Sequence, residues 1–198
     1  QGETVVAVLP GETATLKPSG GERVVFLTDG RQYIIFDRLV FDAINVGINV
    51  IKITYGSDES TSAHHIRIQN SELRNSLSQG ILINGTGGGG GNELLNNNIH
   101  HNGRNGDSNH SHGMYWSGPK NAIIRGNNVH DNIGYGIQIQ YNTGVNTIVE
   151  QNWVHHNGGG GMVIISDQQN IVVRNNIVSN NSAVGLNYGR GVSNSNAA

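Results

Sequence analysis

The chain contains no cysteine, little charge and no long hydrophobic run. Without cysteine there are no disulfide bonds, thiolate metal ligands or cysteine nucleophiles. The apolar runs are far shorter than the roughly 20 residues of a membrane-spanning helix, so no membrane segment is predicted. Only 13% of residues are charged and the net charge is −2. A chain of this kind has no basic field for a nucleic-acid backbone or an anionic membrane, and neither partner is expected.

Glycine and asparagine are abundant instead, and the apolar residues come in short, regularly spaced groups. Together with the scarcity of proline, this composition favours many short strands joined by tight turns over disorder. A chain of 198 residues is long enough for one sizeable core. We therefore expect a single domain over residues 1–198, with an N-terminal coil or cap region over 1–32, regular coils over 33–190 and a polar tail over 191–198.

Five segments share one pattern, in which a short strand and a polar corner lead to an apolar anchor and then to a glycine that opens a second strand. The anchors are Leu73, Ile99, Val129, Val154 and Val178, and the glycines are Gly80, Gly113, Gly136, Gly161 and Gly185. A looser earlier copy takes Val40 as its anchor and Gly47 as its glycine. A period of about 25 residues with several short strands is typical of a parallel β-helix. We predict an all-β, single-stranded right-handed parallel β-helix, a solenoid of about seven coils.

Stacked coils place equivalent residues in rows along the solenoid. Two rows of asparagine are expected to bond to one another and to the turns: Asn97, Asn127, Asn152 and Asn176, and Asn102, Asn132, Asn157 and Asn181. Arg125, Glu150 and Arg174 form an outward row of alternating charge, which we interpret as a structural ladder. His100, His130 and His155 form another outward row. We interpret it as a ladder of solvated turn residues, with metal binding as the alternative.

Two coils contain more residues than the repeat requires, and such insertions into a solenoid are where function is expected. One excess lies in residues 102–112 and the other around residues 55–64. The first precedes its glycine-opened strand and the second follows its own. They should border the outward face of these strands from opposite sides and form a groove. The predicted floor of this groove is Asn49, Leu82, Tyr115, Gln138, Val163 and Asn187.

Aromatic rings edged by amides and hydroxyls suit sugars, which present apolar C–H faces surrounded by hydroxyl groups. The groove is therefore predicted to bind a polysaccharide or oligosaccharide. The candidate substrate-binding residues are Tyr135, Gln138, Gln140, Ser117 and Asp107.

Residues 6–12, 33–39, 65–70 and 112–115 resemble segments of the right-handed β-helix proteins that include polysaccharide lyases and uronan epimerases. The resemblance covers residues 24–191. It implies removal of the proton α to a uronate carboxyl by a Lys, an Arg, or a His and Tyr pair. The matching candidates are Lys120 with Arg125, or His112 with Tyr115. The resemblance also allows Ca²⁺, but acidic residues do not cluster at stacked positions, so no cofactor or metal is predicted.

The preferred hypothesis is a secreted or extracellular carbohydrate-active β-helix, acting as a lyase or epimerase on an acidic polysaccharide. Two alternatives remain open. One is a non-catalytic glycan-binding or adhesive solenoid. The other is a purely structural β-solenoid that associates with further copies end to end or side by side, because its last rung is open to pairing.

Overall fold

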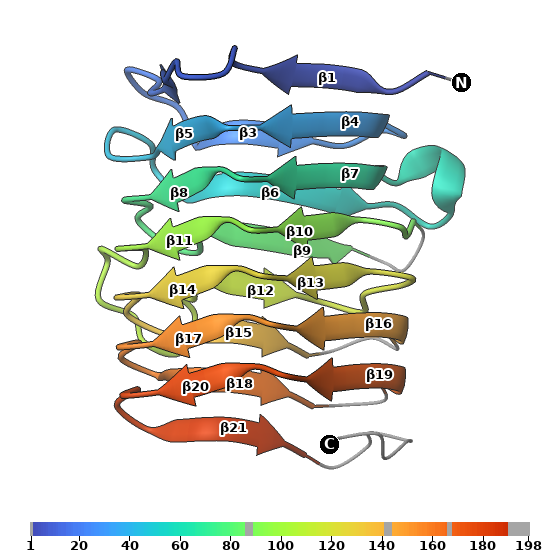
Figure 1. Ribbon diagram of the computed structural model, residues 1–198. Helices are drawn as coiled ribbons and strands as arrows, with labels where there is room; N and C mark the ends of the chain where they lie inside the picture. Colours follow the sequence, from blue (N-terminus) through green and yellow to red (C-terminus); the bar gives the residue numbers. More distant parts are fainter. Residues whose placement is uncertain (1, 86–88, 141–143, 166–167, 190–198) are drawn as a thin grey trace.

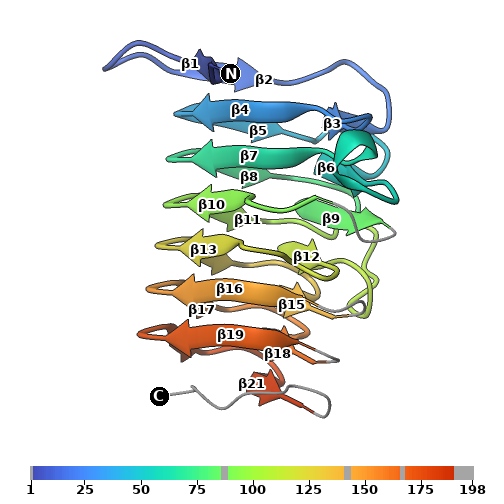
Figure 2. The same ribbon diagram turned by 90° about the vertical axis from the view of Figure 1, so that its right-hand side faces the viewer.

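The chain folds into a parallel β-helix in which three seven-stranded sheets run along the stack of coils (Figures 1 and 2). A computed structural model describes residues 2–85, 89–140, 144–165 and 168–189. The fold class and the number of coils are as the repeat predicted. The polar tail expected over residues 191–198 lies outside the described part of the chain.

Each coil contributes one strand to each sheet, and every strand pairs in parallel with its equivalents in the adjacent coils. Sheet A contains β1 (Thr4–Ala7), β4 (Gln32–Asp37), β7 (His64–Gln69), β10 (Glu93–Leu95), β13 (Ile123–Arg125), β16 (Val145–Glu150) and β19 (Gln169–Arg174). Sheet B contains β2 (Ala14–Leu16), β5 (Leu39–Asp42), β8 (Glu72–Arg74), β11 (Asn98–His100), β14 (Asn128–His130), β17 (Trp153–His155) and β20 (Ile177–Ser179). Sheet C contains β3 (Arg23–Leu27), β6 (Asn49–Tyr55), β9 (Ile81–Gly85), β12 (Met114–Trp116), β15 (Tyr135–Ile139), β18 (Gly160–Ile164) and β21 (Val184–Tyr188).

The core fills the inside of the coils because alternate strand residues point inward. The anchors Leu73, Ile99, Val129 and Val154 are fully buried and stack in register through sheet B. On sheet C the inward residues of successive coils are likewise buried apolar side chains, which include the aromatic Trp116. This continuous apolar column is the main stabilising element of a solenoid.

The two predicted asparagine rows are present as buried ladders. In the first, Asn127 Oδ1 accepts hydrogen bonds from the backbone N–H and the side-chain amide of Asn97, both at 3.0 Å. Asn127 Nδ2 in turn donates to Asn152 Oδ1 at 2.9 Å and to the Leu94 carbonyl at 2.9 Å. The second row, which includes Asn132, repeats this pattern. Each ladder therefore satisfies the polar groups of a corner that water does not reach.

Gly80, Gly113, Gly136 and Gly161, which open strands of sheet C, are required because coils approach closely there. A Cβ on Gly136 would lie 2.4 Å from Val154 Cγ1 and 3.1 Å from the Gly161 carbonyl. A Cβ on Gly80 would lie 2.5 Å from the Gly113 carbonyl. Contacts this short leave no room for a side chain, which explains the recurring glycine.

The predicted alignment of the earliest copy is wrong. Phe41, not Val40, stacks on Leu73, and Val50, not Gly47, occupies the position equivalent to Gly80. The turn between Phe41 and β6 is two residues longer than in the later coils. The seven-residue step therefore does not apply there, and Gly47 belongs to the turn.

Candidate functional site

A surface pocket of about 300 Å³ lies on the outward face of sheet C, beside the longer loop formed by residues 102–112. Its floor comes from β9, β12 and β15, whose residues Leu82, Tyr115 and Gln138 are in register. The loop forms one wall. The lining residues are Gln79, Leu82, Asn84, Asn109, His110, His112, Tyr115, Gln138 and Gln140. Leu82, Tyr115 and Gln138 of the predicted groove floor therefore line one pocket, whereas Asn49, Val163 and Asn187 do not, and its lining contains no residue of the 55–64 segment.

The two excess segments leave sheet C at opposite ends of its strands, as predicted. Residues 102–112 lead into β12, whereas the 3₁₀ helix η1 (Glu59–Thr61) follows β6. In Figure 1, η1 protrudes on the right, next to the ends of β6 and β7.

His112 is fixed in place at the edge of the pocket and is 1% exposed. Its Nδ1 accepts the backbone N–H of Tyr135 at 3.0 Å. Burial, followed by the nearby His110, lowers the pKa of His112 to about 4. The ring is therefore neutral at neutral pH. Because Nδ1 accepts a hydrogen bond, the ring proton is on Nε2, so that His112 lacks a free nitrogen to act as a base. The ring also forms a hydrogen bond with the backbone of Asn109, which raises its pKa by less than burial lowers it.

Tyr115 and His112 come together as the sequence predicted. Their rings are 6.0 Å apart and nearly parallel, with 18° between the planes. Gln138 and Gln140 lie in the same pocket, and the Gln138 side-chain amide donates to Gln140 Oε1. Gln138 Oε1 is buried and has no hydrogen-bond partner among the described residues. A ligand hydroxyl could donate to this oxygen if the Gln138 side chain turned towards the pocket.

The basic pair predicted from Lys120 and Arg125 does not form. Arg125 lies on sheet A, where its Nε donates to Glu150 Oε1 at 2.6 Å. Glu150 also accepts from Arg174 at 2.6 Å, which confirms the charge ladder. Lys120 lines a different pocket, together with Glu59, His65 and residues 89–91. Neither side chain is among those that line the pocket of Tyr115.

The other three predicted binding residues do not line the pocket. The ring of Tyr135 is 5.5 Å from that of His112, but Tyr135 is not among the lining residues. Asp107 is on the loop and pairs with His110 at 2.9 Å, which holds the pKa of Asp107 below its ordinary value. Ser117 is 5% exposed and is not among the lining residues.

Sequence reasoning missed Lys52, which occupies the outward position beside Leu82 where Asn49 was predicted. Partial burial, followed by repulsion from Arg23, lowers the pKa of Lys52. The misplaced alignment of the first copy hid this residue. The signal that could have found it is the pair Ile51 and Ile53, which are both buried. Because successive strand residues point to opposite faces, Lys52 between them lies on the outer face.

The histidine row of sheet B is a stacked ladder, as predicted, but is more buried than solvated turn residues would be. The rings of His100, His130 and His155 follow one another at 5.0 Å. Each Nε2 contacts a side chain of the preceding coil, which is Glu72 for His100 at 3.0 Å and Asn128 for His155 at 2.9 Å. Burial is the largest cause that lowers the pKa of His100 and His155.

Comparison with known proteins places this geometry in a family. The family model described as the right handed beta helix region matches residues 24–197. The chain belongs to the right-handed β-helix family. No curated protein matches the sequence, and no helix of the described residues is long and apolar enough to cross a membrane.

Solved structures with this β-helix fold include the pectate lyase Pel9A, which is 17% identical with a TM-score of 0.51. The match covers 93% of this chain and 64% of the lyase chain. The A-module of the mannuronan C-5 epimerase AlgE4 from Azotobacter vinelandii is 14% identical with a TM-score of 0.40, and the match covers 91% of this chain and 60% of that one. The match thus spans less than two thirds of either solved chain. At 17% identity the likeness to Pel9A shows the fold alone.

Proposed function

We propose that the protein is an extracellular carbohydrate-active β-helix that acts on an acidic polysaccharide, as a lyase or an epimerase, at the outward face of sheet C. The observation that carries the proposal is the pocket in which Tyr115 lies between the neutral imidazole of His112 and the buried amide of Gln138. Gln138 is 8% exposed and its Oε1 has no partner among the described residues. A sugar hydroxyl would supply the missing donor.

Positive charge beside the pocket supports an acidic substrate. Lys52 is next to Leu82 on the outward face, and Arg23 is close enough to Lys52 to lower its pKa. A uronate carboxylate bound across these strands would relieve this repulsion between like charges. Neutralisation of the carboxylate also makes the adjacent carbon acid easier to deprotonate.

The reaction begins when a base removes the proton α to the carboxyl group. In a lyase, the electron pair left on carbon forms a C=C bond while the glycosidic C–O bond breaks, and the leaving oxygen takes up a proton. In an epimerase, a proton returns to the same carbon from the opposite face. We assign the proton transfer at one face to Tyr115, which lines the pocket and, as tyrosinate, takes the α-proton. In a lyase it then protonates the leaving oxygen, and in an epimerase water supplies the proton at the opposite face. His112 helps to position these groups, because its Nδ1 accepts the Tyr135 N–H and holds the ring in place.

The test is an activity screen of the whole chain on alginate, pectate and glycosaminoglycans. Lyase activity is followed by the ultraviolet absorbance of the unsaturated product, and epimerisation by NMR of the recovered polymer. We expect turnover of at least one uronate polymer and its loss in Tyr115→Phe. Asn187→Ala is the matched control, since Asn187 belongs to the same outward row but lies outside the pocket lining. Absence of both products on every polymer would falsify the catalytic proposal.

Non-catalytic glycan binding is the second candidate, and the fixed tautomer of His112 favours it. The nitrogen that could accept a proton already accepts the Tyr135 N–H, so the His112 and Tyr115 pair lacks its predicted base. This candidate predicts that uronate oligosaccharides bind without being changed. Isothermal titration then shows affinity that falls roughly tenfold in Gln138→Ala, as expected when one or two hydrogen bonds are lost.

A further inference from the structure

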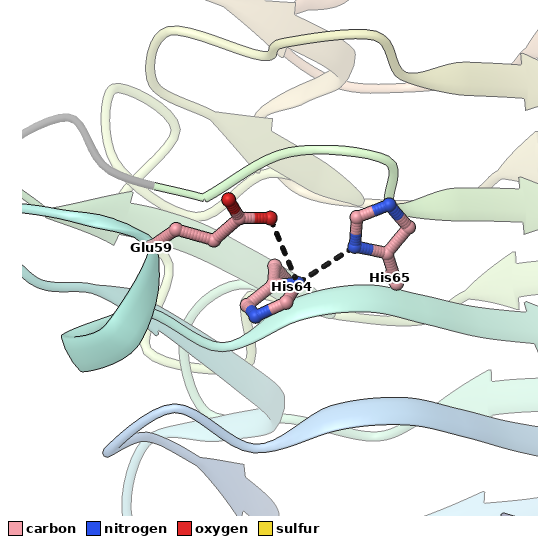
Figure 3. A group of neighbouring side chains, drawn as sticks. All are labelled: Glu59, His64 and His65. Atoms are coloured by element: carbon pink, nitrogen blue, oxygen red, sulfur yellow. Dashed lines mark hydrogen bonds and ion pairs between the residues drawn. The ribbon is translucent and has the colours of Figure 1, made fainter. Parts of the chain in front are cut away.

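Three side chains with metal-binding atoms meet at the corner between β6 and β7, on the side of sheet C away from the 102–112 loop (Figure 3). Glu59, His64 and His65 each offer one ligand atom, and these atoms lie within 4.8 Å of one another. His64 Nδ1 is 3.5 Å from Glu59 Oε1 and 2.6 Å from His65 Nδ1. No other group of three such residues occurs in the part of the chain that the structure describes.

We propose that Glu59, His64 and His65 bind a divalent transition metal, with Zn²⁺ as the ion that this donor set fits best. Imidazole nitrogen suits Zn²⁺ and its neighbours in the first transition row, whereas Ca²⁺ and Mg²⁺ take oxygen ligands. Zinc–ligand bonds of about 2.0–2.2 Å in a tetrahedron place the donor atoms roughly 3.3 Å apart. The separations of His64 Nδ1 from His65 Nδ1 and from Glu59 Oε1, 2.6 Å and 3.5 Å, lie on either side of that value.

The excess residues between β6 and β7 are folded so that they present Glu59. Asp58 Oδ1 accepts hydrogen bonds from the Thr61 N–H at 3.0 Å and from the Ser60 hydroxyl at 2.7 Å. The Ser62 hydroxyl donates to the Asp58 carbonyl at 2.6 Å. These contacts cap η1 at its start. These hydrogen bonds hold the segment around residues 55–64 in one conformation, in which the Glu59 carboxylate faces His64 and His65 (Figure 3).

Both imidazoles are held in place by the coil. His64 is the first residue of β7 and is 4% exposed. His65 has a left-handed backbone, with φ of 51°, and its ring stacks on Tyr33 with 4.8 Å between centroids. On its other side the ring lies against Gly91, where a Cβ would be 2.7 Å from His65 Cδ2. Little side-chain entropy remains to be lost when an ion binds.

Two further histidine pairs provide an internal comparison. His100 with His101 and His155 with His156 show the same contact between Nδ1 atoms, at 2.7 Å. His101 and His156 have the same left-handed backbone as His65. Neither pair belongs to a group of three ligand atoms in the described residues. What distinguishes the corner between β6 and β7 is therefore the carboxylate that η1 supplies.

The cluster adjoins a pocket of about 240 Å³ lined by Glu59, His65, residues 89–91, Lys120 and Asn121. This side is where water or another small ligand can complete the coordination of the ion. The positive charge of Lys120 opposes a bare cation and favours an anion as the remaining ligand.

The experiment measures Zn²⁺ binding to the whole chain, without a histidine tag, by competition with a chromophoric chelator. We expect one Zn²⁺ per chain, and affinity that falls roughly tenfold or more in Glu59→Gln and in His65→Asn. The matched controls His101→Asn and His156→Asn alter the same kind of histidine pair in the same backbone conformation and should keep the wild-type affinity. Absorption of bound Co²⁺ gives a second readout, because a tetrahedral site gives intense visible bands.

Two results overturn the proposal. One is wild-type protein that binds no Zn²⁺, or binds it with an affinity that Glu59→Gln and His65→Asn leave unchanged. The other is an equal loss in His156→Asn, which would assign binding to histidine pairs in general. The Glu59 side chain is 66% exposed, so Glu59→Gln should fold normally, and circular dichroism checks this. None of these readouts depends on activity towards polysaccharide.

Discussion

His112 Nδ1 accepts the backbone N–H of Tyr135 across two adjacent coils, at a distance of 3.0 Å. The contact joins the end of the 102–112 loop to the start of β15, and burial at this place keeps the imidazole neutral. It therefore links the pocket to the stability of the coil stack, and this link can be measured.

Acidification should destabilise the protein through His112. Burial holds its pKa at about 4, below the ordinary 6.5. Between these values the unfolded chain binds a proton at this ring and the folded chain does not, so that stability falls as the pH is lowered through this window. The full loss is about 3 kcal/mol.

The measurement is urea unfolding of the wild type and of His112→Gln at neutral pH and at about pH 4. The wild type should lose about 3 kcal/mol more than the variant on acidification. Equal losses in the two proteins would show that other groups cause the acid sensitivity.

Substitution of Arg125 should have a small effect on stability and none on any polysaccharide activity. The Arg125 side chain is 41% exposed, and its partner Glu150 keeps the hydrogen bond from Arg174. We expect Arg125→Gln to cost less than about 1 kcal/mol in the free energy of unfolding. Product formation by Arg125→Gln is measured alongside that of Tyr115→Phe. A loss of activity as large as in Tyr115→Phe would show that Arg125 takes part in the reaction.

Removal of one rung of an asparagine ladder should be much more damaging. Asn127→Ala leaves the Asn97 amide groups and the Leu94 carbonyl without their buried partner, while Asn152 Oδ1 keeps only the backbone N–H of residue 127. Unsatisfied buried groups of this kind cost about 3 kcal/mol together. Thermal and urea unfolding measure the loss. Asn146→Asp, in a row of exposed asparagines, is the control and should stay within about 0.5 kcal/mol.

Gly136 and Gly185 open equivalent strands of sheet C but differ in the space around them, so that their alanine variants form a matched pair. Gly136→Ala places a Cβ 2.4 Å from Val154 Cγ1, and we expect a loss of about 2 kcal/mol from overpacking. Gly185 takes the same place in the last coil, but there the nearest atom to a new Cβ is 3.8 Å away, so Gly185→Ala should be tolerated. Similar melting temperatures for the two variants would contradict the steric explanation.

The repeat predicted most of the fold because, in a solenoid, register follows from sequence spacing. Once Leu73 and Ile99 are recognised as equivalent, every residue between them has a defined neighbour in the next coil. The prediction was wrong where the spacing changes, at the longer turn between Phe41 and Val50, and this error concealed Lys52 on the outward face.

The site was less predictable because it depends on how the loops fold. The approach of His112 to Tyr115 followed from their three-residue separation across the start of a strand. In contrast, Lys120 and Arg125 are close in the sequence but belong to different surfaces, since a solenoid turns a corner between them. The approach of Glu59 to His64 depends on the capping of η1, which no repeat pattern encodes.

Strand pairing in this protein is confined to adjacent coils. The number of coils can therefore change without a change in the residues of the candidate sites. Duplication of the coil between Val129 and Val154 would add one rung, roughly 4.8 Å of sheet. The coils that carry Tyr115 and Glu59 would keep their neighbours. Evolution or an engineer can therefore lengthen the outward face of sheet C by whole coils without displacing the residues of the candidate sites.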